Sequence, residues 1–151
     1  MNQTLTALDL FNQPSSAPKS DFKLRISAYG LLIENGQILL HLSSLNKKYS
    51  LPGGAIEIGE SEREAVKREF LEETGYSVIA TDIIDSGFKL FTFDNNYYHN
   101  VTLFYKVTRD SQTITVPTDT EESSGSQFIS LNNINFDDIQ PVFHDIIKKL
   151  I

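Results

Sequence analysis

The chain has 151 residues, of which 40% are hydrophobic and 11% aromatic, a composition typical of one soluble globular domain. Its 20 acidic and 13 basic residues give a net charge of −7, which disfavours binding to nucleic acid or to an anionic membrane surface. The absence of cysteine excludes disulfide scaffolds, thiolate zinc sites and cysteine nucleophiles. No stretch approaches the roughly 18 apolar residues of a membrane-spanning helix. The N-terminus also lacks the basic region of a signal peptide, so we expect a cytoplasmic protein.

Residues 1–22 show no sustained hydrophobic period and contain two prolines and three serines. We predict an N-terminal arm over these residues, followed by one domain over residues 23–151. The arm is expected to pack either onto its own domain or across a homodimer, and the sequence leaves both arrangements open.

Residues 24–34 are dense in apolar and β-compatible side chains and lead into an Asn-Gly pair, a strong signal for a tight turn. Residues 37–42 are predicted to continue as a second strand. Residues 43–54 are predicted to be a loop, because they are largely polar and end in Pro-Gly-Gly.

A helix is predicted over residues 61–74, with both of its ends marked. Ser61 and Glu64 have the spacing of a capping box, and Gly75 stands where a left-handed C-cap is expected. Further strands are predicted at 77–84, 87–93, 97–107, 111–116 and 126–131. Residues 136–151 carry apolar side chains at helical spacing and predict a packing helix. The order of these elements predicts a mixed α/β (α+β) fold.

Seven glutamates and only three basic residues lie between Glu57 and Glu73, a net charge of −4. On the predicted helix, Glu69, Glu72 and Glu73 share one face and repel one another. Arg68 is expected to point about a quarter-turn away, and one guanidinium cannot neutralise three carboxylates. A divalent cation that prefers oxygen ligands, Mg²⁺ or Mn²⁺, could do so. The alternative is an acidic helix face exposed to water; the glycine-rich loop, whose backbone can approach a ligand closely, favours the cation.

Residues 54–76, GAIEIGESEREAVKREFLEETGY, resemble the signature of the Nudix hydrolase family in its MutT-like form. That signature is a glycine, five residues, a glutamate, seven residues and then arginine-glutamate-apolar-any-glutamate-glutamate-any-glycine-apolar. The nine fixed positions are Gly54, Glu60, Arg68, Glu69, Phe70, Glu72, Glu73, Gly75 and Tyr76. The resemblance extends over about residues 23–150. It implies a Nudix-like α/β/α sandwich with a mixed β-sheet, a helix that carries the signature and a C-terminal helix.

The resemblance also implies a divalent-metal-dependent pyrophosphohydrolase that cleaves a nucleoside diphosphate linked to another moiety, by attack of water on phosphorus. The implied metal ligands are Gly53, Glu69, Glu72 and Glu73, with Glu122 added from a downstream acidic loop. Arg68 is implied to orient Glu69, and Glu60 to support the geometry between loop and helix. The general base is either Glu69 or a loop glutamate such as Glu122, and we favour Glu69.

On the substrate side, we expect contacts from Arg25, from the backbone of Gly54 and from Tyr98, although aromatic residues on strands often pack in a core instead. The three histidines, His41, His99 and His144, have no ligand spacing and are expected to be structural or exposed.

We expect a small-molecule nucleotide as the substrate. A nucleoside triphosphate is favoured, because the tryptophan motif of NADH-cleaving relatives and the proline of ADP-ribose relatives are absent. The alternative function is a non-catalytic Nudix module that senses a nucleotide or regulates a partner. Such a module has no need to retain every metal carboxylate, so the complete signature argues against it.

Overall fold

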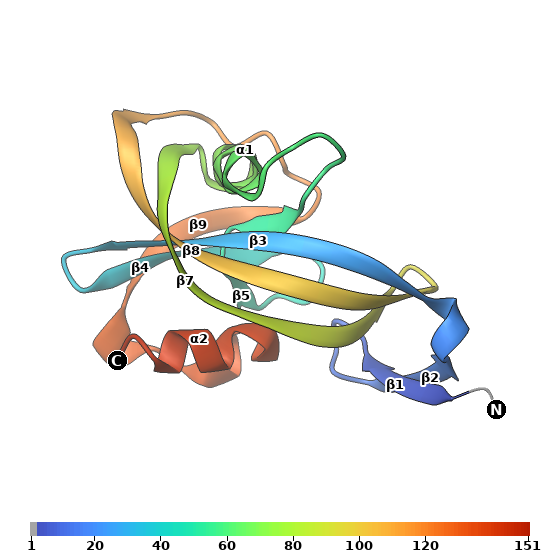
Figure 1. Cartoon of the computed structure of the whole chain (residues 1–151). Helices are drawn as coiled ribbons and strands as arrows, with labels where there is room; N and C mark the ends of the chain where they lie inside the picture. The colour runs from blue at the N-terminus through green and yellow to red at the C-terminus, as the bar shows by residue number, and fades with distance from the viewer. Residues whose placement is uncertain (1–2) are drawn as a thin grey trace.

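Two long antiparallel strands, β7 (Tyr76–Phe93) and β8 (Asn96–Ile114), run through the computed structural model, which describes residues 3–151 (Figure 1). Asp94 and Asn95 join them, with φ angles of 49° and 59°. Positive φ at both central residues marks the hairpin turn whose twist matches that of paired strands. The sequence predicts four shorter strands here. The structure has two, because register shifts between residues 76 and 85 bend β7 without ending it.

The remaining strands of the central sheet are β3 (Phe22–Glu34), β4 (Gln37–Ser43), β5 (Tyr49–Ser50), β6 (Gly53–Ala55) and β9 (Ser123–Ser130). β3 pairs in parallel with β8 and antiparallel with β4, so the predicted mixed sheet is confirmed. β6 pairs with β3 and β9 pairs with β4, which brings the region predicted as a loop and the distant acidic loop to the same edge of the molecule.

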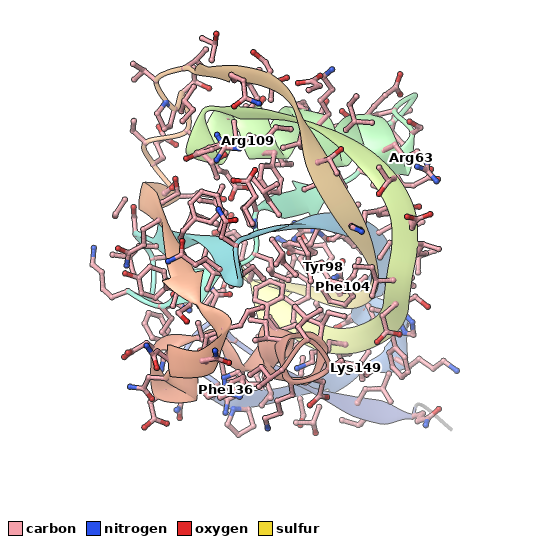
Figure 2. All side chains as sticks on the ribbon, turned by 90° about the vertical axis from the view of Figure 1, so that its left-hand side faces the viewer. Arg63, Tyr98, Phe104, Arg109, Phe136 and Lys149 are labelled. Carbon is pink, nitrogen blue, oxygen red and sulfur yellow. The ribbon has the colours of Figure 1, made fainter. Side chains whose placement is uncertain are left out.

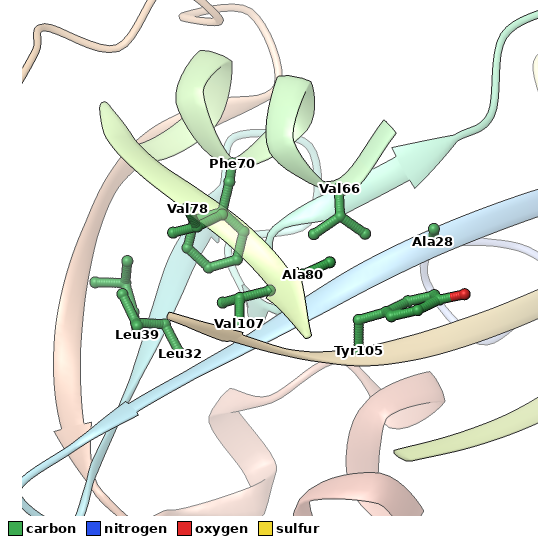
Figure 3. Close-up of a cluster of buried hydrophobic side chains, with 9 residues drawn as sticks. All are labelled: Ala28, Leu32, Leu39, Val66, Phe70, Val78, Ala80, Tyr105 and Val107. Atoms are coloured by element: carbon green, nitrogen blue, oxygen red, sulfur yellow. The ribbon is translucent and has the colours of Figure 1, made fainter. Parts of the chain in front are cut away.

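Helix α1 (Glu62–Thr74) covers one face of the sheet (Figure 1). The predicted capping box is confirmed: the Glu64 N–H donates to Ser61 Oγ, and the Ser61 N–H donates to a Glu64 carboxylate oxygen. Gly75, with a φ of 77°, ends the helix in the left-handed conformation. Val66 and Phe70 are fully buried against apolar side chains of β3, β7 and β8 (Figure 3). Burial of each such side chain stabilises the fold by roughly 1.5–3 kcal/mol and fixes which face of α1 is turned away from the sheet.

The opposite face of the sheet is covered by the C-terminal segment, where Figure 2 labels Phe136 and Lys149. The prediction of one helix over residues 136–151 is wrong. The segment forms two 3-10 turns, Phe136–Asp138 and Pro141–Phe143, and a short helix α2 (His144–Lys148). Proline keeps the preceding Gln140 extended, at φ −58° and ψ 129°, so a helix cannot run through this point. Within residues 3–151, no helix has the length and apolar character needed to cross a membrane.

The predicted N-terminal arm forms a β-hairpin of β1 (Thr4–Leu8) and β2 (Pro14–Pro18), followed by a 3-10 turn at Lys19–Asp21. β1 joins the edge of the sheet through a parallel pairing of Leu8 with Phe91 on β7. The hairpin therefore packs on its own chain, beside the tip of the β7–β8 hairpin (Figure 1). Its only fully covered side chains are small alanines, which leave no hydrophobic period to detect in the sequence.

Candidate active site

An open cavity of about 320 Å³ lies where α1, the sheet and the N-terminal hairpin meet. Residues from many segments of the chain line it, among them Leu10, Arg25, Tyr29, His41, Leu45, Gly53, Gly54, Glu57, Glu69, Glu73, Phe91, Phe93 and Glu122. Strand register separates its two ends. Gly54, which lies against Glu69, is paired with Ala28 of β3. Phe91 of β7 is paired with Tyr98 of β8, which in turn is paired with Lys23, five residues earlier on β3. Five residues of strand span about 16 Å. The cavity therefore has one end at α1 and another at the hairpin.

β6 lies close to β3 on one side and to α1 on the other, and this arrangement requires two glycines. Gly53 has a φ of 150°, and a Cβ there would lie 2.3 Å from the Ala28 carbonyl oxygen. A Cβ on Gly54 would lie 2.7 Å from Glu69 Oε1. A side chain at Gly53 would force β6 away from β3, and one at Gly54 would force β6 away from α1. The Gly-Gly pair therefore lets backbone lie directly against the carboxylates of α1.

Glu69 and Glu73 project into the α1 end of the cavity, with side chains only 16% and 6% exposed. Burial, together with the neighbouring Glu73 carboxylate, raises the pKa of Glu69 to about 7. Burial raises the pKa of Glu73 to about 8. The Gly53 N–H donates to Glu73 Oε1 over 3.4 Å, and His41 Nε2 lies 2.6 Å from Glu73 Oε2. Because burial lowers the pKa of His41 to about 4, this imidazole is uncharged at neutral pH and brings no positive charge to the pair.

Arg68 connects the loop before α1 to the helix. Its guanidinium donates two hydrogen bonds to Glu60, at 2.8 and 3.0 Å, and one to the Ala55 carbonyl oxygen, at 3.1 Å. Its Nη1 also reaches Glu69 at 2.9 Å and Glu72 at 3.3 Å. The expectation that Arg68 points away from the acidic face is therefore wrong, because its side chain is long enough to curl back. These contacts hold the pKa of Glu60 below and that of Arg68 above their usual ranges.

Glu72 and Glu122 have different positions relative to the cavity. The Glu72 side chain is 41% exposed and turned toward Arg68, and it does not line the cavity. Glu122 does line it, on the loop that precedes β9, and the Ser44 N–H donates to its carbonyl oxygen. Burial and the nearby Asp119 and Glu69 raise the pKa of Glu122. Among residues 3–151, no three histidine, aspartate or glutamate side chains are gathered closely enough to form a ready-made ion site.

Arg25 enters the cavity from β3 and lies against two aromatic rings. The carbon of its guanidinium is 5.3 Å from the centre of the Phe91 ring and 5.7 Å from that of Tyr98, and the two rings stack on each other. Within the described residues, Arg25 forms no ion pair, and its buried Nε has no hydrogen-bond partner. Tyr98 itself does not line the cavity; it contacts the cavity residues Arg25 and Phe91 from behind and so supports their positions.

The structure therefore brings Arg25, Gly53, Gly54, Glu69, Glu73 and Glu122 around one cavity, with Arg68 and Glu60 behind Glu69. Sequence reasoning missed His41 as a cavity residue and left open whether Phe91 stacks on a base or packs in the core. A histidine in the otherwise apolar run 38–42 was a usable signal, because a polar side chain at a buried position needs a partner. Phe91 carries no such signal, since strand aromatics are common in cores.

Solved structures support the fold. A MutT NUDIX hydrolase from Burkholderia pseudomallei matches 85% of this chain and 99% of its own, with a TM-score of 0.67 and 17% identity. A MutT protein from Methanosarcina mazei Go1 matches 85% of this chain and 94% of its own, with a TM-score of 0.66 and 25% identity.

A curated Bacillus subtilis (strain 168) protein named "Putative 8-oxo-dGTP diphosphatase" is 49% identical over 47 residues, or 31% of this chain. The match spans about a third of that relative's length, 32%. The family model described as the NUDIX domain matches residues 23–150, the span over which the signature and the fold agree. The chain therefore belongs to the NUDIX family.

Proposed function

We propose that the chain is a divalent-metal-dependent pyrophosphohydrolase that cleaves a nucleoside diphosphate linked to another moiety. One observation carries the proposal: two buried carboxylates, Glu69 and Glu73, face the same cavity as the unpaired guanidinium of Arg25. The carboxylates need positive charge and the guanidinium needs negative charge. A phosphate chain with a divalent cation supplies both at once.

The donor set suits Mg²⁺ or Mn²⁺. Glu69, Glu73 and Glu122 offer carboxylate oxygens, Gly53 offers a backbone oxygen, and hard cations favour such ligands. The pKa values of Glu69, Glu73 and Glu122 are raised because negative charge on these side chains is unfavourable without a cation. The side chain of Glu72 is turned toward Arg68 and away from the cavity, so its role as a metal ligand stays a prediction from the sequence.

When bound, the cation offsets phosphate charge and increases the acidity of water. The chain's own residues do the rest. Glu69 accepts a proton from the attacking water and so acts as the general base. Water oxygen bonds to phosphorus, the bridging P–O bond breaks, and the leaving oxygen keeps the bonding electrons. Arg68 holds Glu69 in orientation, and Arg25 binds the phosphate chain from the other side.

A nucleoside triphosphate is the substrate that we favour. The printed name of the Bacillus subtilis relative, an 8-oxo-dGTP diphosphatase, supports this choice over a short shared segment. A cytoplasmic location and a homodimer remain predictions from the sequence.

The test compares hydrolysis of a nucleotide panel, with Mg²⁺, by the wild type and by Glu69→Gln and Glu73→Gln. Each substitution keeps the shape of the side chain and removes its charge. We expect kcat to fall about 10²- to 10⁴-fold in both. Glu121→Gln is the matched control, since Glu121 is an exposed neighbour of Glu122 that does not line the cavity. Its activity should stay within about twofold of the wild type.

Thermal unfolding separates catalytic loss from misfolding. Removal of a buried charge with a raised pKa should leave the metal-free Glu73→Gln protein at least as stable as the wild type at pH 8. Full activity in either glutamine variant would contradict the proposal. Nucleotide binding by the wild type without turnover of any substrate would favour the sensor module instead.

A further inference from the structure

The N-terminal hairpin contributes a wall to the catalytic cavity, although it lies outside residues 23–150 that match the family model. Leu10, in the loop between β1 and β2, lines the cavity. It also borders two neighbouring hollows, of about 160 and 560 Å³. Leu10 therefore lies where the catalytic cavity and the two hollows meet.

The loop that carries Leu10 is held in one conformation. Asp9 Oδ1 accepts hydrogen bonds from the N–H groups of Phe11 and Gln13, both at 2.8 Å. The Asp9 N–H donates to the Gln13 carbonyl oxygen at 3.0 Å, and Asn12 takes up a left-handed φ of 62°. An aspartate that closes its own loop and an asparagine in the left-handed region define a tight turn. Leu10 is thus presented by a preorganised loop.

Two contacts tie this hairpin to the rest of the chain. The Asn46 side-chain amide donates to the Leu10 carbonyl oxygen at 3.2 Å, and the Asn46 amide oxygen accepts from the Lys48 N–H. On the other side, Ser15 Oγ lies 2.6 Å from the Tyr97 hydroxyl. Asn46 follows the cavity residue Leu45, and Tyr97 is paired with Thr92, which lies between the cavity residues Phe91 and Phe93. The position of Leu10 is therefore set relative to the site and not only within the hairpin.

The hairpin end of the cavity has a different chemistry from the α1 end. Apolar side chains gather there: Leu10, Leu45, Phe91 and Phe93 all line it. Among the cavity-lining residues that the structure describes, Arg25 is the charged side chain that lies against this apolar group, with its guanidinium over the Phe91 ring. A flat, aromatic group suits such a place, because its faces meet the apolar side chains while Arg25 holds the phosphate chain that leads from it toward the α1 end.

We propose that Leu10 of the N-terminal hairpin is a specificity-determining residue that contacts the nucleobase while the phosphates lie at the α1 end. The proposal rests on the proposed function for its choice of ligand. It assigns the hairpin to recognition of the base, so loss of Leu10 should weaken binding of ligands that carry a base and leave binding of a bare phosphate chain intact.

The experiment measures dissociation constants by titration calorimetry in Mg²⁺ with two probes. One is a purine nucleoside triphosphate with a methylene group in place of the α,β-bridging oxygen, and the other is inorganic tripolyphosphate. Leu10→Ala should weaken the nucleoside probe about tenfold and leave tripolyphosphate within twofold. Leu10→Met, which keeps apolar volume, should restore binding of the nucleoside probe to within about threefold of the wild type.

Phe11→Ala is the matched control, because Phe11 is the next residue, is 62% exposed and does not line the catalytic cavity. It should change neither dissociation constant by more than twofold, and thermal unfolding verifies that each variant folds. Equal weakening of both probes by Leu10→Ala, no weakening of either, or a wild type that binds no nucleoside probe would overturn the inference. Wild-type binding of that probe without hydrolysis of any nucleotide would contradict the proposed function and leave the inference standing.

Discussion

The two ends of the cavity differ in how the chain builds them. The glycines and the helix carboxylates of the α1 end come from residues 53–76, one continuous stretch in which helix geometry alone places Glu69 and Glu73 on the same face; His41 and Glu122 join them from elsewhere in the chain. The hairpin end comes from the β1–β2 loop, β3, β7 and the loop after β4, which meet only through strand pairing. The first end holds charge and the second holds apolar surface. Chemistry is thus encoded locally, whereas the surface available to distinguish substrates depends on the whole fold.

After the two glutamate substitutions, the largest expected effect comes from breaking the α1 end at Arg68. Arg68→Ala removes hydrogen bonds to Glu60, Glu69 and Glu72 and frees Glu69 to move. We expect kcat to fall about 10- to 100-fold, the usual cost of losing a residue that orients a metal ligand. Arg68→Lys should recover only part of the activity, since a lysine cannot reproduce the two-pronged contact with Glu60. Steady-state kinetics with saturating Mg²⁺ measure both.

Arg63→Ala is the control for Arg68→Ala. Arg63 lies on the same helix (Figure 2), and it donates to the carbonyl oxygens of Ala80 and Thr81, both at 2.7 Å. Its loss should lower the melting temperature by a few degrees and leave kcat within threefold. If both variants lost activity equally, Arg68 would act on the stability of α1 and not on the orientation of Glu69.

The contrast between the ends also explains which residues could be predicted. The cap of α1, its left-handed end at Gly75 and the position of Glu69 and Glu73 follow from spacing within a few residues. His41 could not be placed, because its contact with Glu73 depends on how β4 lies against α1. Tyr98 stays a predicted substrate contact; in the structure its cross-strand partner Phe91 lines the cavity, and that pairing depends on the register of β7 and β8.

For the fold, too, the sequence predicts what local spacing determines and misses what depends on contacts between distant segments. Alternating apolar residues predicted β3 and β4 correctly, since their Asn-Gly turn fixes the pairing locally. The N-terminal hairpin was read as an irregular arm, because β1 and β2 bury only small side chains and gain order by pairing with β7. The length of the C-terminal helix is overestimated from the sequence, because helical spacing of apolar residues also fits the two 3-10 turns Phe136–Asp138 and Pro141–Phe143.

A second prediction concerns the stability of the α1 end without metal. The folded-state pKa values of Glu69 and Glu73, about 7 and 8, exceed the ordinary glutamate value of 4.5. Their contribution to stability is therefore present below about pH 4.5 and is lost as the pH rises toward 8. His41, whose pKa is lowered to about 4, acts in the opposite direction but only below its ordinary pKa of 6.5. In EDTA, the melting temperature should fall by several degrees between pH 6.5 and 8.5.

Mg²⁺ or Mn²⁺ should remove this pH dependence, because a cation stabilises the ionised carboxylates. At a concentration about 100-fold above its dissociation constant, binding adds about 2.7 kcal/mol, or about 5–10 °C in a chain of this size. Circular dichroism melts with and without EDTA measure both effects. The Glu73→Gln protein should lose most of the dependence on pH and on metal. A wild-type melting temperature that responds to neither would contradict a cation site at Glu69 and Glu73.

The smallest expected effect lies at the hairpin end, where Tyr98 contacts Arg25 without lining the cavity. Tyr98→Leu keeps apolar volume but removes one of the two rings beneath the guanidinium. We expect KM to rise about threefold while kcat is unchanged, because a cation–π contact of this kind is worth about 0.5–1 kcal/mol and acts here on binding.

Phe88→Leu tests whether the position of the ring matters. Phe88 is three residues before Phe91 on the same strand, so its side chain points to the opposite face of the sheet, where it stacks on His99. The Phe88→Leu variant should keep KM within about 1.5-fold of the wild-type value. A similar rise in KM for both variants would mean that the β7–β8 hairpin loosens as a whole. A rise confined to Tyr98→Leu would place Arg25 and Phe91 at the centre of substrate binding, since these are cavity residues that Tyr98 contacts, whereas Phe88 stacks on His99.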